Sequence, residues 1–310
     1  MKNVLVVYYS QSGQLLEIAK NVTKDLEDSQ DVNLTFYEIK LKEDFPFPWT
    51  KDEFYDAFPE TFLQIPSELS DLENPILKQK YDLVILAYQV WYLSPAIPIN
   101  SFLKNDIVKE LLQNTPVITL IGARNMWIQA QEKVKRLLVA NNVNLVGNIA
   151  LVDRHINHVS VITIVHWMFN GDKNKRFIGV FPKPGVSQKD IDESIKFSAV
   201  ILNHLLQSRY DTLQTNLLAL GAVKIKSFLV LVDKRANVIF SKWANYIHGK
   251  GRSKGAERRL SVMMFSRYLM FAIWFIAPIV FVLFLLTYVP LIGRIKKDKK
   301  YFSSVQYKKS

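Results

Sequence analysis

The stretch KNVLVVYYSQSGQLLEIA, residues 2–19, carries the sequence signal that decides the fold. An apolar run over residues 4–9 ends abruptly at Ser-Gln-Ser-Gly-Gln, and apolar residues with helical spacing begin at Leu15. This order predicts a buried strand, a tight loop and the start of a helix. The loop has no lysine and is therefore not a Walker A loop. Its hydroxyls and glycine favour a phosphate held by neutral donors, the alternative being an ordinary turn.

Two further apolar runs also end in loops that are candidates for ligand binding. Residues 81–87, YDLVILA, lead into QVWYLSP at 89–95, and residues 116–121 lead into GARNMW at 122–127. Runs that are apolar throughout predict parallel strands buried on both faces. Ligands bind beyond the carboxyl ends of such strands, so we expect the three loops to form one site. The alternative is that the aromatic residues of the second loop only cap the core.

Taken together, the three loops resemble those of flavodoxin-like proteins, which bind FMN. In that family the loop after the first strand holds the phosphate, and in the related quinone reductases the other two loops enclose the isoalloxazine ring. The resemblance implies an α/β fold with a doubly wound, five-stranded parallel sheet. Leu15 stands where the family usually has a hydroxyl. The implied cofactor-binding residues are Ser10, Gln11, Ser12, Gly13, Gln14, Leu15, Trp91, Tyr92, Ser94, Gly122, Arg124, Asn125 and Met126.

A fifth strand is expected over residues 145–152, and it leads into Asp153-Arg-His155 and His158. Two histidines at the carboxyl end of a strand could transfer protons or bind an anion, so we take His155 and His158 as candidate catalytic residues. A third metal ligand is missing nearby, and no metal site is expected. The alternative is that both histidines are structural.

Two segments depart from a minimal flavodoxin. Residues 41–79 form a long connection that contains FPFPW at 45–49, and residues 153–186 form an insertion that bears the histidines. Long connections in compact domains are commonly binding loops or lids. The aromatic connection could form a wall for a greasy substrate or face a membrane, or it could simply pack over the sheet edge.

The chain has no cysteine. Disulfides, cysteine-ligated metals and a thiol nucleophile are therefore excluded. The N-terminus shows no secretory signal, so we expect the domain to stay in the cytoplasm.

The charge is unevenly distributed along the chain. Residues 1–220 contain 22 Lys and Arg against 25 Asp and Glu, whereas residues 221–310 contain 18 against 3. Such asymmetry marks a separate functional tail. Within it, residues 268–292 carry no charge and are long enough to cover a hydrocarbon core of ~30 Å. We therefore expect a C-terminal hydrophobic membrane helix.

The residues around the apolar helix bear on its orientation and its partners. Basic residues flank the apolar helix on both sides, so orientation is ambiguous, and Pro278 could bend the helix into a re-entrant one. Membrane lipids, not nucleic acid, are the expected partners of residues 221–310. We expect the protein at the cytoplasmic face of the inner membrane.

The expected organisation of the chain has four parts. They are the FMN-binding domain 1–210, a basic amphipathic juxtamembrane region 211–267, a transmembrane or re-entrant helix 268–292 and a basic tail 293–310.

A narrower resemblance rests on SQSGQL, FPFPW, GARNMW and the basic membrane tail. Together they are similar to the bacterial dialkylresorcinol condensing enzyme family of flexirubin-type pigment pathways. Condensation commonly needs an activated cysteine, which this chain lacks. The resemblance therefore implies an FMN-dependent oxidoreductase that aromatises a lipid-like dialkyl-cyclohexanedione to a dialkylresorcinol.

Other functions remain open from the sequence. A membrane-tethered NAD(P)H:quinone reductase and a flavodoxin-type electron carrier fit the same fold, as does a protein that has lost its flavin. NAD(P)H is one candidate redox partner, although no Gly-x-Gly-x-x-Gly fingerprint is present. Flavodoxin-like reductases are often dimers, so a homodimer is also considered.

Overall fold

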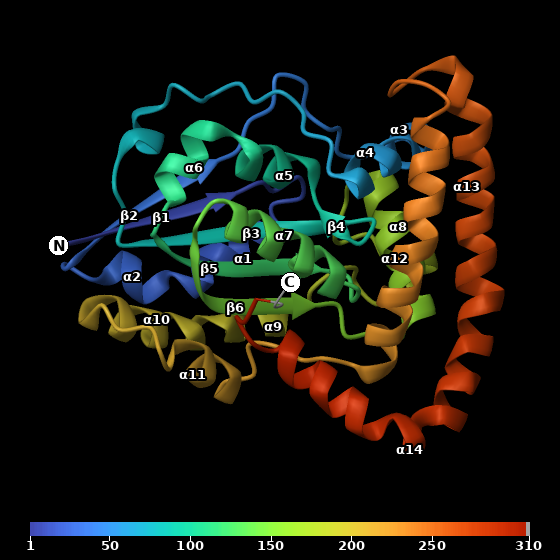
Figure 1. Ribbon diagram of the computed structural model, residues 1–310. Helices are drawn as coiled ribbons and strands as arrows, with labels where there is room; N and C mark the ends of the chain where they lie inside the picture. Colours follow the sequence, from blue (N-terminus) through green and yellow to red (C-terminus); the bar gives the residue numbers. More distant parts are fainter. Residues whose placement is uncertain (308–310) are drawn as a thin grey trace.

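Five parallel strands form the centre of the computed structural model, which describes residues 1–307 (Figure 1). Their order across the sheet is β2-β1-β3-β5-β6, and the two-residue strand β4, Ser94–Pro95, pairs antiparallel with the end of β3. Without β4, this is the flavodoxin-like order 2-1-3-4-5, which confirms the predicted fold class. The strands are β1 Lys2–Tyr8, β2 Val32–Glu38, β3 Leu83–Trp91, β5 Pro116–Ala123 and β6 Asn144–Val152.

The sheet is buried on both faces. Successive residues of β1 point to opposite sides, so Leu5 and Val7 join one core cluster while Val4 and Val6 join the other. This explains why the strand sequences are apolar throughout instead of alternating. One face is covered by α5 Ile97–Lys104, α6 Asp106–Leu112 and α7 Ile128–Ala140; the other is covered by α1 Gln14–Val22, α2 Lys24–Asp28, α9 Gln188–Asp192, α10 Lys196–Gln207 and α11 Leu213–Ala219.

The long connection and the insertion meet at the carboxyl end of the sheet. The connection forms α3 Lys51–Asp56 and α4 Phe58–Leu63, and the insertion forms α8 Asn157–Asn170. The backbone N–H of Trp49 donates to the carbonyl of Met168 at 2.8 Å, which joins the FPFPW segment to α8. The two segments that distinguish this chain from a minimal flavodoxin therefore pack together.

The C-terminal part belongs to the same folded unit. Helix α12, Ser227–His248, is fixed to α7 because the Asp233 carboxylate accepts hydrogen bonds from the backbone N–H groups of Ile128, at 2.9 Å, and Gln129, at 3.3 Å. The structure thus places the end of the domain later than residue 210. Helices α11 and α12 contribute to the core instead of forming a separate juxtamembrane region.

A long helical rod follows α12. It consists of α13 Arg259–Phe271, a π-helical turn Ala272–Ile276 and α14 Ala277–Phe302. The rod Ala256–Phe302 is long and apolar enough to cross a membrane. Figure 1 shows it descending beside α12 and then turning back beneath the sheet. The expected basic tail 293–310 is therefore partly helix; its last three residues lie outside the described part of the chain.

Phe302 gives a test of whether the C-terminus is part of the core. Its side chain is 4% exposed and lies in the core cluster that contains Val134 and Leu138 of α7. The side chain of Phe275 is 62% exposed. Phe302→Ala is expected to lower the free energy of unfolding by about 3 kcal/mol because it leaves a cavity. The matched Phe275→Ala should change it by less than about 0.5 kcal/mol. Urea unfolding in detergent measures both; equal effects would contradict this placement.

Candidate functional site

The loop after β1 leaves the first turn of α1 open. Gly13 occupies the N-cap position with φ +78°, and no side chain caps the helix. A left-handed residue is readily supplied by glycine, and its missing side chain leaves open space above the N–H groups. Among the described residues, the buried Ser10 Oγ has no hydrogen-bond partner. An uncapped helix N-terminus and an unpartnered hydroxyl therefore lie within one loop.

Three other residues of this segment have structural partners. Gln11 Nε2 donates to the Pro46 carbonyl at 3.0 Å, which ties the loop to the FPFPW segment. The Gln14 amide forms two hydrogen bonds with the backbone of Val186, at 3.0 and 3.1 Å. Leu15 is buried in the core and packs against Gly122, where a Cβ would lie 3.1 Å from Leu15 Cδ1. Gly122 is thus explained by packing.

The aromatic pair at the end of β3 is split by a tight turn. Trp91 and Ser94 pair across the β3–β4 hairpin, so Tyr92 and Leu93 form its two-residue turn with φ of 46° and 60°. Positive φ at both turn residues is the type I′ pattern. Trp91 stays beside the end of β1 and the FPFPW segment, with its ring centroid 6.2 Å from that of Tyr9 and 5.3 Å from that of Trp49.

Tyr92 faces the other way. Its hydroxyl donates to the Phe54 carbonyl at 2.6 Å, and its ring contacts Phe58 and Phe265. These two residues pack with Phe240 and Ile247 of α12 in what we call the cluster beneath α12. Burial raises the pKa of this hydroxyl well above its usual value. The turn therefore places Trp91 and Tyr92 in different aromatic clusters.

Ser94 is fully buried and accepts a hydrogen bond from Lys133 Nζ of α7. The same ammonium donates to the Phe62 carbonyl at 2.8 Å and lies 3.6 Å from the Phe62 ring centroid. Burial lowers the pKa of Lys133 to about 7, with Arg136 adding to the effect and Asp233 opposing it. Ser94 thus holds the hairpin in place from behind the site, and sequence reasoning missed Lys133 because it occupies an ordinary helix position.

The loop after β5 presents polar groups toward the insertion. Arg124 Nη1 donates to Asn157 Oδ1 at 2.8 Å, and Asn125 Nδ2 donates to the same oxygen at 3.1 Å. The Asn125 Oδ1 atom is buried without a partner among the described residues. Burial lowers the pKa of Arg124 to about 10, with nearby Asp153 opposing. Met126 packs into the cluster beneath α12 and is not part of this polar group.

The two histidines have different surroundings. His155 Nδ1 lies 2.7 Å from Oδ1 of the buried Asp153, whose other oxygen accepts from Ser160 Oγ at 2.6 Å. This arrangement orients the ring and leaves Nε2 free. His158 Nε2 instead lies 3.1 Å from the backbone carbonyl of Ile273 in the apolar rod. His158 therefore contacts the apolar rod and not Asp153.

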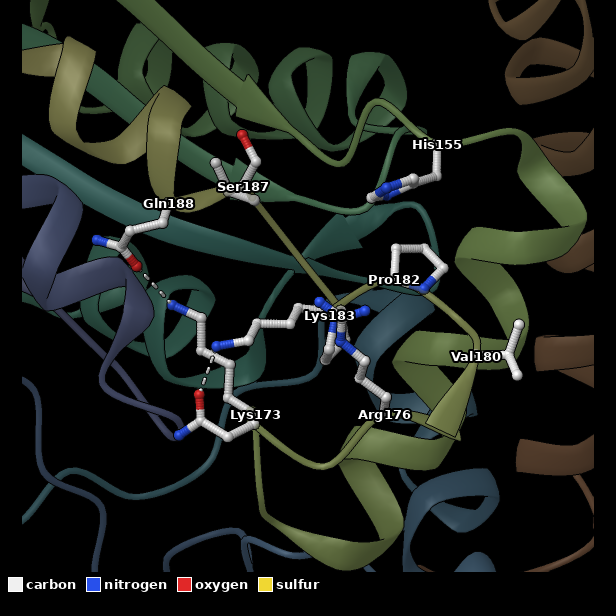
Figure 2. Close-up of a pocket in the computed structure, with 11 residues that line it drawn as sticks. His155, Lys173, Arg176, Val180, Pro182, Lys183, Ser187 and Gln188 are labelled. Carbon is white, nitrogen blue, oxygen red and sulfur yellow. Dashed lines mark hydrogen bonds between the residues drawn. The ribbon is translucent and has the colours of Figure 1, made fainter. Parts of the chain in front are cut away.

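The side chain of His155 lines a basic cavity of about 630 Å³ (Figure 2). Lys173, Arg176 and Lys183 line it together with His155, and Lys183 Nζ donates to Asn174 Oδ1 at 2.8 Å. The same segment contains Val186, which bonds to Gln14 of the first loop. The cavity thus adjoins α1 and suits an anion. The KNKR run at 173–176 was the available sequence signal for it.

No protein-family model matches this sequence, and no curated protein matches it. Solved structures similar in fold include a flavoprotein with FMN from Lactobacillus acidophilus NCFM, with 21% identity, TM-score 0.36 and coverage of 48% of this chain and 93% of that one. An archaeal flavodoxin has 13% identity and TM-score 0.37, covering 66% and 99%. An NAD(P)H:quinone oxidoreductase from Methanothermobacter marburgensis has 12% identity and TM-score 0.31, covering 56% and 99%. The flavodoxin-like fold assignment rests on the strand order of this chain.

The buried Lys133 gives a pH-dependent stability. Its folded pKa of about 7 lies below the ordinary 10.5, so the unfolded chain binds more protons between these values. The free energy of unfolding should therefore rise with pH from about 7 to about 10, by at most about 1.4 kcal/mol per unit.

Lys133→Met removes the titrating group and keeps an apolar stem of similar length. Urea unfolding of both proteins across this pH range gives the difference in slope, in which the other titrating groups cancel. Parallel curves would contradict a depressed pKa at Lys133.

Proposed function

We propose that the protein is an FMN-dependent oxidoreductase. The observation that carries this proposal is the loop after β1, where the unpartnered Ser10 Oγ lies beside the uncapped N-terminus of α1. A phosphate dianion accepts hydrogen bonds from such groups and is stabilised by the helix dipole. Ser12 and the backbone N–H groups of residues 11–15 complete the proposed phosphate site, whereas the side chains of Gln11, Gln14 and Leu15 are used elsewhere.

The loops after β3 and β5 fit the ring end of the same cofactor. Asn125 has an unpartnered amide oxygen, which can accept a hydrogen bond from a pyrimidine N–H, and Arg124 lies beside it. Trp91 supplies an aromatic surface at the end of the neighbouring strand. These positions agree with the general rule that ligands of doubly wound sheets bind outside the strand carboxyl ends.

When bound, FMN would accept or deliver a hydride at this edge. The chain's own contribution is proton handling and charge. His155 can take a proton at Nε2 because Asp153 holds its Nδ1. The basic cavity beside it can bind an anionic group of a redox partner, and NAD(P)H carries such groups.

We further propose a lipid-like substrate, a dialkyl-cyclohexanedione that becomes a dialkylresorcinol. Aromatisation removes one hydride, which passes to FMN, and one proton, which passes to a base such as His155. The ring gains a C=C double bond, and no new carbon atoms are joined. The absence of cysteine fits this step better than a thiol-dependent condensation. The apolar rod supports a place at a membrane, for which we propose the cytoplasmic face of the inner membrane.

The proposal is tested by reconstitution. Full-length protein in detergent, incubated with FMN and freed of excess, should be yellow with about one flavin per chain. Anaerobic addition of a dialkyl-cyclohexanedione should bleach the flavin and yield the resorcinol, detected by mass spectrometry. A protein that stays colourless would overturn the flavin assignment. Bleaching only by NAD(P)H, followed by reoxidation of the flavin by a quinone, would replace the proposed substrate by a quinone.

Ser10→Ala separates a ligand role from a structural one. Because Ser10 Oγ has no partner among residues 1–307, its loss should leave the stability of flavin-free protein unchanged. It should weaken FMN binding roughly tenfold or more, the cost of one hydrogen bond to a charged group. Ser198→Ala is the matched control, since Ser198 Oγ accepts from the Asp25 N–H at 2.7 Å.

The control should show the opposite pattern: about 1 kcal/mol less stability and unchanged FMN affinity. Flavin fluorescence titration and urea unfolding measure the two quantities. Unchanged FMN affinity in Ser10→Ala would remove the phosphate site from this loop.

His155 and His158 form a second matched pair. His155→Gln should slow substrate-dependent flavin reduction about a hundredfold by removing the proton acceptor. His158→Gln should have little effect on this rate because His158 bonds to Ile273 in the rod. Stopped-flow absorbance measures both, with equal flavin content as the control. Equal rates in the two variants would exclude His155 from proton transfer.

A further inference from the structure

The start of the apolar rod is clamped to the domain by a buried ion pair. Arg258 is fully buried, and its guanidinium donates to Asp56 at 2.7 and 2.8 Å and to Glu60 at 2.6 Å. Breaking such a pair leaves uncompensated buried charge, which commonly costs about 3–5 kcal/mol. The rod therefore begins at a fixed point beside α3 and α4.

The first two thirds of the rod lie along α12. Phe265 stacks on Phe58 with ring centroids 3.8 Å apart, and further along Phe281 meets Phe228 of α12 at 4.9 Å. Between them, the Ile273 carbonyl is bonded to His158. The rod is thus attached to α4, α8 and α12 along its length.

The end of the rod returns to the sheet. Lys135 Nζ donates to the carbonyls of Ser304, at 3.1 Å, and Gln306, at 2.9 Å. The Tyr307 hydroxyl donates to the Val143 carbonyl at 2.8 Å, next to the edge strand β6. Both ends of the rod are therefore fixed to the same domain, and a crossing with ends on opposite sides of a bilayer would have to break one set of contacts.

A full crossing would also draw α12 into the bilayer. Arg235 and Lys242 are exposed on α12, beside the apolar rod. Each charge at the bilayer centre costs at least about 2.5–3.5 kcal/mol. The packing that holds the rod is therefore compatible with shallow insertion and not with a span.

The returning part of the rod exposes apolar side chains on all sides. From residue 285 to residue 293 every residue is exposed, with Leu286 at 74% and Val289 at 76%. Pro290 lies within this segment of α14. Figure 1 shows that the rod turns back toward the sheet. A protein partner would cover one stripe of a helix, whereas lipid surrounds it. Lipid is therefore the better match for this surface.

The charges beside this surface fit an anionic membrane. Arg259 and Arg267 precede the apolar part, and Arg294, Lys296 and Lys297 follow it. Both basic groups flank the apolar part toward ends of the rod that are attached to the domain. Each basic residue near an anionic leaflet contributes about 1 kcal/mol of attraction.

We propose that residues 268–292 form a membrane elbow that enters and leaves a single anionic leaflet, so that both ends of the rod stay on the domain's side. This rests on the membrane attachment in the proposed function and deepens it by defining topology and lipid charge. It does not depend on flavin, and flavin content is measured separately on the same samples.

Topology is tested with single cysteines, since the chain has none. Arg252→Cys lies before the rod and Gln306→Cys lies after it, both with exposed side chains. The full chain is expressed in bacteria, and inside-out inner-membrane vesicles and intact spheroplasts are treated with a membrane-impermeant maleimide. We expect both cysteines to react in the vesicles and neither to react in spheroplasts. Reaction of the two from opposite sides would establish a span and overturn the proposal.

Whether lipid covers the exposed surface of the elbow is tested with a polarity-sensitive fluorophore. Leu286→Cys carries it on the elbow, and Val139→Cys, at an exposed apolar residue of α7, is the matched control. Vesicles of phosphatidylcholine and phosphatidylglycerol should shift only the Leu286 probe to the blue, and nitroxides near the headgroups should quench it more than nitroxides at the bilayer centre. No shift, together with a concentration-dependent dimer, would assign the surface to a second copy.

Discussion

The burial of the sheet on both faces is the constraint on which the rest of the structure depends. Helices cover β1 from both sides, so polar chemistry has no place except the strand ends. The parallel arrangement directs all five carboxyl ends to one edge, and the loops after β1, β3, β5 and β6 meet there. The unpartnered atoms of Ser10 and Asn125 both lie in these loops. Buried polar atoms are normally paired, and the position of these two at the strand ends supports the proposed ligand site.

Much of this edge could be predicted from the sequence, because strands buried on both faces leave an unmistakable apolar run and the first loop has a recognisable composition. The direction in which each loop side chain points could not be predicted from the sequence. Tyr92 is the example: its neighbour Trp91 stays with the site, but the two-residue turn rotates Tyr92 into another cluster. His158 shows the same limit, since its partner Ile273 lies far along the chain. Turn geometry and distant partners are not encoded in local periodicity.

The domain boundary was misjudged for a different reason. Charge composition places a break near residue 220, yet single buried ions join the two sides of that break. Asp233 binds the N-terminus of α7 and Arg258 binds α3 and α4. Burial raises the pKa of Asp233 to about 7, while the α7 N–H groups and Lys133 oppose the shift. A segment can thus be strongly basic overall and still be fastened to an acidic domain through a few buried contacts.

The contact between His158 and Ile273 links the membrane proposal to the chemical one. Helix α8 begins two residues after His155, and at its first turn it contacts the apolar rod. The basic cavity and the rod are therefore separated by one short helix. A substrate with long alkyl chains would partition into the same leaflet as the elbow, which raises its effective concentration without any added contact. Its polar ring could then reach the strand edge while its chains stay among the aromatic residues of the connection. The two departures from a minimal flavodoxin, the connection and the insertion, pack together at the carboxyl end of the sheet and would supply the wall that such a substrate needs.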